Sequence, residues 1–273
     1  MADAKQLKKV ADIVLSDPER RVVVVSAPGK RGDHDFKVTD LLINLANDIR
    51  DGKDYQSDLN KVISRYSSIA NDLKLGPAIT ETIKNDLQSR IENRNTEFPK
   101  FLDCMKAAGE DNTAKLLAAY FKKLGKDAEY VNPKDAGLFL SEEYGNAQVI
   151  PRSYTLLKGL LDRKGVIVFP GFFGYSESGD IVTFSRGGSD VTGSIVAQGC
   201  RADIYEKYLK GEFDEYKKWM SSLYTPLSWN YKDDWYIWQY LNRGKLEGYT
   251  GGEIYIDMNV LNKEKELDDL IIE

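Results

Sequence analysis

The chain has 273 residues, which is enough for one large α/β domain or two modest ones. Its formal charge of −5 gives no support for a nucleic-acid partner or an anionic membrane surface. Its apolar runs are too short to cross a bilayer, and no basic segment followed by an apolar one opens the chain. We therefore expect a cytoplasmic protein without a membrane partner, in which the isolated Cys104 and Cys200 are reduced thiols.

The first part of the chain alternates helical and extended patterns. A helix is predicted over residues 5–15, because its apolar residues recur on one helical stripe. Residues 21–26 form a continuous β-branched run, which is typical of a strand buried on both faces of a parallel sheet. Thr39 is predicted to cap a following helix that runs through Ile49.

The middle of the chain is helical in composition from 59 to 105, with breaks at Gly76-Pro77 and at residues 97–99. Further elements are predicted as a helix over 112–124, a strand over 128–131, a helix over 153–162 and a strand over 165–169. Strands alternating with helices indicate a layered α/β sheet, whose ligand-binding loops lie beyond the carboxyl ends of its strands.

The run from Phe184 to Asp190 combines a predicted strand over 181–184, the glycines Gly187 and Gly188, and a predicted helix over 191–198. This arrangement is suited to an anion, because glycines let a ligand approach the backbone and a helix N-terminus offers free N–H groups. Arg186 adds a planar fork for a carboxylate or phosphate. The alternative is a plain loop in which Ser189 and Asp190 only cap the helix.

Arg-Gly-Gly-Ser-Asp at 186–190, together with Gly-Phe-Phe-Gly at 171–174, resembles the aspartate kinases of the amino-acid kinase family. Three earlier blocks extend the resemblance in the family's order: the strand and loop at 22–29, Thr-Asp-Leu-Leu at 39–42, and the Gly-Glu helix at 108–120. The resemblance covers about residues 1–205. It implies a three-layer sandwich with a mostly parallel sheet, and phosphoryl transfer from ATP, with Mg2+, to the side-chain carboxylate of L-aspartate in amino-acid biosynthesis.

The resemblance also implies roles for individual residues. Arg186 would grip the α-carboxylate of aspartate, and Glu110 would meet its ammonium group; the alternative for Glu110 is a first-turn acid favoured by the helix dipole. Asp190 would orient a polar group or magnesium near the transferred phosphate. Thr39 and Ser189 would donate their hydroxyls to substrate oxygens, and Phe172 would form an aromatic wall of the pocket. Gly187 and Gly188 would contact phosphate oxygens through their backbone N–H groups.

Two departures from the family pattern lead us to expect impaired activity. The family's first strand and its Lys-Phe-Gly-Gly loop, which carries the lysine that meets the transferring phosphate, have no counterpart before residue 20. After Asp203 the sequence does not continue into the family's nucleotide-binding segment. A non-catalytic remnant that still binds a ligand, or a chimeric fragment, is therefore the alternative to an active kinase. A homodimer is possible by the same resemblance.

Composition changes abruptly near residue 206, because all four tryptophans fall between Trp219 and Trp238. The aromatic-rich tail over about 208–262 is similar to the end of the glycoside hydrolase family 25 lysozymes, and Asp257 sits where that family places an acidic site residue. We therefore predict a truncated kinase-like domain over 1–205 and a short α/β tail over 206–273. A cell-wall muramidase fragment is a third functional alternative.

Overall fold

The computed structural model describes residues 1–94, 96–185, 187–202, 219–221, 237–244 and 256–261. The chain divides into two compact units, Met1–Ala202 and Asp203–Glu273. Each unit is described by itself below.

A parallel sheet lies at the centre of the first unit, with the strand order β1-β3-β2. The strands are β1 (Val22–Val25), β3 (Val166–Pro170) and β2 (Ala128–Tyr130). Val24 pairs with Phe169, and Tyr130 pairs with Val168. The three strands confirm the prediction of a parallel α/β sheet, within one or two residues of the predicted bounds.

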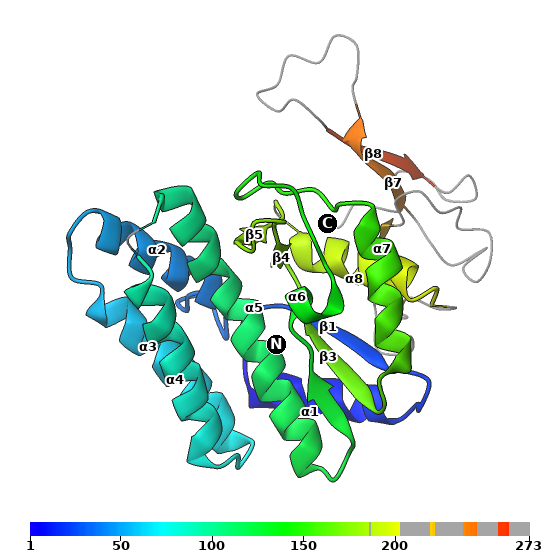
Figure 1. The fold of residues 1–273 in the computed structure, drawn as a ribbon. Helices are drawn as coiled ribbons and strands as arrows, with labels where there is room; N and C mark the ends of the chain where they lie inside the picture. Colours follow the sequence, from blue (N-terminus) through cyan, green and yellow to red (C-terminus); the bar gives the residue numbers. More distant parts are fainter. Residues whose placement is uncertain (95, 186, 203–218, 222–236, 245–255, 262–273) are drawn as a thin grey trace. The chain divides into compact units, whose positions relative to one another are not determined.

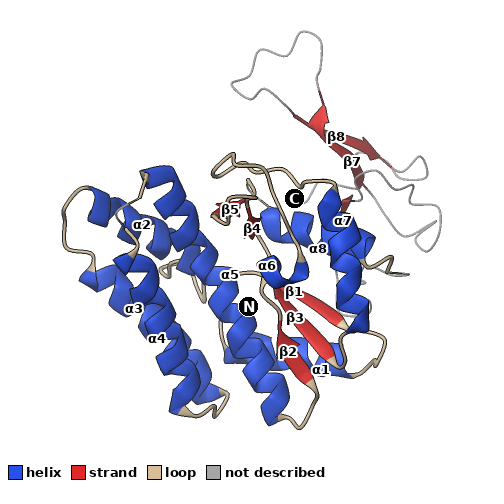
Figure 2. Ribbon diagram, in the orientation of Figure 1, coloured by secondary structure: helices blue, strands red, loops and turns tan. Residues whose placement is uncertain are grey.

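Helices cover both faces of this sheet and form a layered arrangement (Figure 2). Side chains alternate across each strand, so that Val25 and Val168 face one core while Ile167 and Phe169 face the other. The first core is shared with the long helix α5 (Phe98–Lys123) and the second with α8 (Gly188–Gly199). This architecture confirms the predicted α/β class.

The helical layer on the α5 side contains α1 (Ala4–Leu15), α2 (Val38–Arg50), α3 (Gln56–Asp72) and α4 (Pro77–Glu92). In Figure 1, α3 and α4 lie to the left of α5, and the sheet lies to its right. The predicted breaks are confirmed, because Pro77 begins α4 after Gly76 and Pro99 lies in the first turn of α5.

Helix α5 is longer than predicted, because it runs without interruption for 26 residues. The predicted helix begins only near Asp111, although glycine costs about 1 kcal/mol relative to alanine inside a helix and does not by itself end one. Gly109 is instead inside the helix because Ala27 packs directly against it: a Cβ at Gly109 would lie 2.7 Å from the Ala27 Cβ. The interpretation of Glu110 as a first-turn acid is therefore wrong.

The layer on the other face contains α7 (Arg152–Leu156), continued by the 3-10 helix η1 (Leu157–Asp162), and α8. A short helix, α6 (Pro133–Ala136), precedes them. The predicted strand over 181–184 does not join the parallel sheet. It forms β5 (Ile181–Thr183), which pairs antiparallel with β4 (Phe173–Tyr175) as a separate hairpin. The Ser176 N–H donates to the Asp180 carbonyl and closes the hairpin turn.

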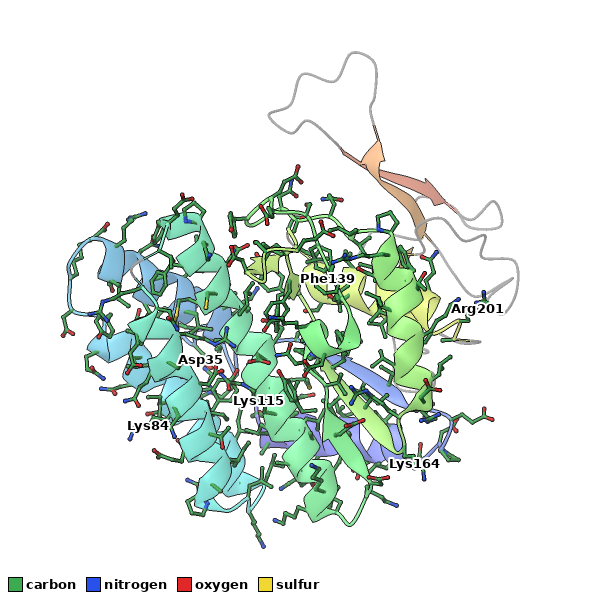
Figure 3. All side chains as sticks on the ribbon, in the orientation of Figure 1. Asp35, Lys84, Lys115, Phe139, Lys164 and Arg201 are labelled. Atoms are coloured by element: carbon green, nitrogen blue, oxygen red, sulfur yellow. The ribbon has the colours of Figure 1, made fainter. Side chains whose placement is uncertain are left out.

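A buried ionic network joins α5 to α4 and β2. The Arg90 guanidinium donates to Asp111 at 2.6 Å and to Asp86 at 2.9 Å. Lys115, labelled in Figure 3, contacts Asp111 at 2.8 Å, and the Tyr130 hydroxyl donates to the other oxygen of that carboxylate. Every charge in this network has an opposite charge beside it, as buried ions require.

The second unit contains a three-stranded sheet in the order β6-β7-β8. Its strands are β6 (Trp219–Ser221), β7 (Ile237–Gly244) and β8 (Ile256–Leu261); β6 is parallel to β7, and β8 is antiparallel to it. Asp257 lies in β8, but its side chain is outside the described structure, so the resemblance to a glycoside hydrolase stays a prediction. Among the described residues, no helix is long and apolar enough to span a membrane.

Candidate functional site

The candidate site lies at the carboxyl ends of β1 and β3. Just beyond these ends, the Gly171 N–H donates to the Val25 carbonyl at 2.9 Å, which holds the two loops together. Ala27 leaves β1 at this edge, and Phe172 leaves β3. Ligands of open α/β sheets bind beyond this edge, because the loops there are free to vary while the strands are fixed.

Glu110 projects from the middle of α5 toward the start of the loop after β1. The Ala27 N–H donates to its Oε1 at 3.1 Å, an approach made possible by the missing Cβ of Gly109. Its other oxygen, Oε2, is buried and has no hydrogen-bond partner. Burial raises the pKa of the Glu110 carboxyl to about 8, which the single Ala27 hydrogen bond lowers only in part.

Phe172 stands at the same edge in a strained backbone conformation. Its φ is 73°, in the left-handed region that side chains with a Cβ rarely adopt. Its N–H donates to the Thr192 hydroxyl at 3.0 Å, and its carbonyl accepts from the Phe184 N–H at 2.9 Å. These two bonds hold the backbone of Phe172, whose half-buried ring lies beside Gly188 at the start of α8. Its role as an aromatic wall stays a prediction.

The loop before α8 differs from the capping alternative. Gly187 is the N-cap, with φ at 80°, and Ser189 and Asp190 lie inside the first turn of the helix rather than capping it. Ser189 packs directly on Gly171, since a Cβ at Gly171 would lie 2.8 Å from the Ser189 Cβ. The capping alternative is therefore wrong, and Ser189 is brought to the edge where β3 ends.

The two glycines of this loop serve different purposes. A Cβ at Gly188 would lie 2.7 Å from both the Phe172 ring and the Phe184 Cβ, so packing requires glycine there. The Gly188 N–H donates to the Ser185 carbonyl at 3.2 Å and is engaged within the turn, contrary to the expectation that both glycines offer free N–H groups. Gly187 needs its positive φ, and nothing lies within 4 Å of the position of its missing Cβ.

Thr39 reaches the site from α2. This helix begins at Val38, and its N-cap is Lys37, so the prediction that Thr39 is the cap is wrong. The Val38 N–H donates to the Pro28 carbonyl at 3.0 Å, which ties the start of α2 to the loop after β1. The half-buried Thr39 therefore follows the same loop whose Ala27 contacts Glu110.

The buried Arg65 of α3 holds this loop in place. Its guanidinium donates to the Gly29 carbonyl at 2.8 Å, to the Phe36 carbonyl at 3.1 Å, and to both oxygens of Asp35 at 2.7 Å. Asp35 is labelled in Figure 3. The loop between β1 and α2 is thus fixed at both ends.

The structure brings Glu110, Phe172 and Ser189 to one edge of the sheet, with Thr39 in the first turn of α2, after the loop that follows β1. Arg186 lies outside the described residues, so its predicted contact with a carboxylate stays a prediction. Asp190 is exposed in the first turn of α8. Sequence reasoning did not identify Arg65, Asp103 or Lys106; the 103, 106 and 110 spacing on one helical face was the available signal for the last two.

The described residues fit a nucleotide phosphate and magnesium only in part. Gly187, with nothing within 4 Å of the position of its missing Cβ, leaves open space at the N-terminus of α8, which suits phosphate. Within the described part of the chain, no group of three or more His, Cys, Asp or Glu side chains could hold a metal ion. Magnesium beside a nucleotide needs only one or two carboxylates in addition to phosphate oxygens, and Asp190 is positioned to be one.

A model of the amino acid kinase family matches residues 1–208. The chain belongs to the amino acid kinase family. Aspartokinase 3 of Bacillus subtilis is 53% identical over 208 residues, which are 76% of this chain and 46% of that protein. An aspartokinase of Mycolicibacterium smegmatis is 34% identical over 111 residues, covering 40% of this chain and 26% of the relative.

Solved aspartate kinases share the fold of this amino acid kinase. The enzyme of Clostridium acetobutylicum matches with a TM-score of 0.62 and 32% identity, over 74% of this chain and 43% of that structure. Aspartokinase III of E. coli in complex with aspartate and ADP matches with a TM-score of 0.61 and 24% identity, over 74% and 45% of the two chains. The chain thus spans less than half the length of these relatives.

Proposed function

We propose that this chain carries the amino-acid-binding part of an aspartate kinase, which transfers a phosphoryl group from ATP to the side-chain carboxylate of L-aspartate. The observation that carries the proposal is Glu110. A buried carboxyl with one unpartnered oxygen is costly, and the ammonium group of an amino acid would supply both the missing donor and the missing charge. The 53% identity to an aspartokinase supports aspartate as that amino acid.

The other residues of the edge complete the proposed binding mode. Arg186 would bind the α-carboxylate through a two-pronged hydrogen bond, while the hydroxyls of Thr39 and Ser189 would donate to substrate oxygens. Phe172 would form one wall. ATP supplies the phosphoryl group when it is bound, with Mg2+ neutralising its charge, and the backbone at Gly187 together with Asp190 would face that phosphate end.

Transfer to a carboxylate produces a mixed anhydride, aspartyl phosphate, which is an activated form of aspartate suited to amino-acid biosynthesis. The protein's part in this step is positioning and charge neutralisation rather than covalent chemistry. We place the reaction in the cytoplasm, where ATP is available. A homodimer stays a prediction, which the mass of the purified protein by light scattering would test.

Calorimetric titration of the full chain tests the proposal. L-aspartate should bind saturably, and succinate, which keeps both carboxylates but lacks the ammonium, should bind at least tenfold more weakly because it leaves Glu110 unsatisfied. Arg186→Ala should abolish aspartate binding. Equal affinity for aspartate and succinate would overturn the assigned role of Glu110, and a folded chain that binds neither would overturn the proposed function.

Phosphoryl transfer is measured separately, by trapping the acyl phosphate with hydroxylamine in the presence of ATP, Mg2+ and aspartate. A hydroxamate that depends on all three would support catalysis by this chain. Aspartate binding without any hydroxamate would instead support the ligand-binding alternative and would contradict phosphoryl transfer by this chain.

A further inference from the structure

Asp103 is a buried carboxylate on α5, and it lies outside the set of residues assigned to the site. Its side chain is 1% exposed, and its Oδ2 accepts from two backbone N–H groups, those of Gly145 at 2.7 Å and Thr183 at 2.8 Å. Its Oδ1 lies 2.6 Å from Nζ of Lys106, one turn further along the helix. All three contacts are charge-assisted and short, which makes them strong.

These contacts join α5 to the segment that carries the aromatic wall. Thr183 ends β5, and the next residue, Phe184, donates its N–H to the Phe172 carbonyl. Phe184 also packs against Gly188, at the start of α8. Asp103 therefore anchors the hairpin at the point from which both the Phe172 wall and the α8 loop extend.

Lys106 makes a second connection between α5 and this wall. Its ammonium lies 5.8 Å from the centre of the Phe172 ring, over the aromatic face, while its side chain is 13% exposed. It precedes Glu110 by four residues, so the two side chains share one face of the helix. The helix thus carries Glu110 and, one turn earlier, the lysine that contacts the opposite wall.

We propose that the Asp103–Lys106 pair is a positioning element, which sets the spacing between Glu110 on α5 and the Phe172–Ser189 wall and so determines the affinity for the amino acid. The proposal rests on the proposed function. A buried ion pair adds little net stability compared with well-packed apolar residues. Stability alone therefore does not explain why Asp103 and Lys106 are charged at this position. The pair lies where α5, which carries Glu110, meets the end of β5 and Phe172, and the substrate must fit between Glu110 and the Phe172–Ser189 wall.

Lys115 provides a matched control on the same helix. It pairs with Asp111 at 2.8 Å and lies 5.6 Å from the centre of the Tyr130 ring, so it repeats both contacts of Lys106. Its partners belong to α4, α5 and β2, and none of them carries a residue assigned to the wall. Lys106→Met and Lys115→Met therefore each remove an ion pair and a ring contact, one facing the candidate site and one facing the α4 side. Lys115→Met also removes a second ion pair, with Asp86 at 3.0 Å.

The experiment measures the Kd for L-aspartate of the full chain by calorimetry, alongside the unfolding midpoint in urea. Lys106→Met should raise the Kd about tenfold, because a small misplacement of binding groups is enough to lose that much. Lys106→Arg, which can keep both the ion pair and the ring contact, should recover most of the affinity. Lys115→Met, which loses two ion pairs, should lower the midpoint at least as much as Lys106→Met but keep the Kd within about twofold.

Asp103→Asn supplies a second test that does not depend on Lys106→Met folding. The amide oxygen of the new asparagine can still accept from the Gly145 and Thr183 N–H groups. Its NH2 group would face the Lys106 ammonium in place of a carboxylate oxygen, so the ion pair is lost and the Kd should also rise. A Kd unchanged in Asp103→Asn and Lys106→Met, or raised equally in Lys115→Met, would overturn the proposal and leave the pair a purely structural one. An unaltered chain that binds no aspartate would overturn the proposed function itself, a distinguishable result.

Discussion

Binding of aspartate should take a proton from Glu110. Without a ligand, the buried Glu110 carboxyl has a pKa of about 8, because burial disfavours its charged form more than hydrogen bonds from the backbone of Ala27 and of Glu110 itself favour it. At pH 7 this carboxyl is therefore about nine-tenths protonated. The ammonium of aspartate favours the carboxylate instead, so binding should release about 0.9 proton at pH 7.

The neighbours of Glu110 do not provide another source of that proton. Tyr66, the closest other titratable group, donates its hydroxyl to the Gly109 carbonyl, and burial raises its pKa far above the working range. Asp111, the next residue in α5, is paired with Arg90 and Lys115. Glu110 is thus the group whose charge state a ligand at this edge would change.

The same equilibrium predicts how affinity depends on pH. If only the ionised carboxylate binds the ammonium, the apparent Kd is the intrinsic Kd divided by the ionised fraction. With a pKa of about 8, this makes binding weaken ~9-fold between pH 7 and pH 6, and strengthen ~5-fold between pH 7 and pH 8. Calorimetry at pH 7 in phosphate and in Tris, which have different ionisation enthalpies, counts the released protons directly.

Two controls make this test specific. Succinate has no ammonium, so any residual binding should release no proton from Glu110. Glu110→Gln, which keeps an acceptor for the Ala27 N–H, should lose most of the aspartate affinity and all of the linked proton. Binding of aspartate with no proton released and a Kd that is flat from pH 6 to pH 8 would refute the reasoning, because Glu110 would then already be ionised in the free protein.

Three further predictions concern stability, each measured by urea unfolding. The pKa of Glu110 is raised in the folded state, so the stability that its neutral form contributes is fully present below about pH 4.5 and is lost as the pH rises through about 8. Glu110→Gln should therefore reduce the loss of stability between pH 6 and pH 9. An unchanged dependence of the unfolding free energy on pH would contradict this. Gly109→Ala should destabilise the protein by about 1–3 kcal/mol, because its Cβ would collide with Ala27, and a neutral effect would show that the helix and the loop can separate freely. Arg65→Met should cost about 3 kcal/mol by leaving Asp35 and two loop carbonyls without their buried donor, and a loss below 1 kcal/mol would contradict the anchoring role.

Most of the fold could be predicted from local sequence signals. The β-branched runs that became β1 and β3 are buried on both faces, and their pattern depends only on that burial. Gly76-Pro77 and Pro99 predict where α4 and α5 begin, because proline is accepted in the first turn of a helix and not in its interior. These elements obey rules that act within a few residues along the chain.

The features of the site that sequence patterns do not predict depend on distant contacts. Gly109 indicates a helix boundary locally, and it is kept inside α5 by Ala27, 82 residues earlier in the numbering. Asp103 receives its two N–H donors from residues 42 and 80 positions away. The strain at Phe172 depends on bonds to Thr192 and Phe184. Local periodicity contains no information on such contacts, so the geometry of the site required the structure.

The contrast between Glu110 and Asp111 gives the strongest argument for the position of the ligand. These two acids are adjacent on α5, and both side chains are buried. Asp111 is fully satisfied by the protein, through Arg90, Lys115 and Tyr130, and it fixes α5 against α4 and β2. Glu110 has one backbone donor and one unpartnered oxygen. A fold that surrounds one acid with cations and leaves its buried neighbour without any keeps that neighbour as a neutral carboxyl, which a cation arriving from outside, at the carboxyl end of β1, would ionise and bind.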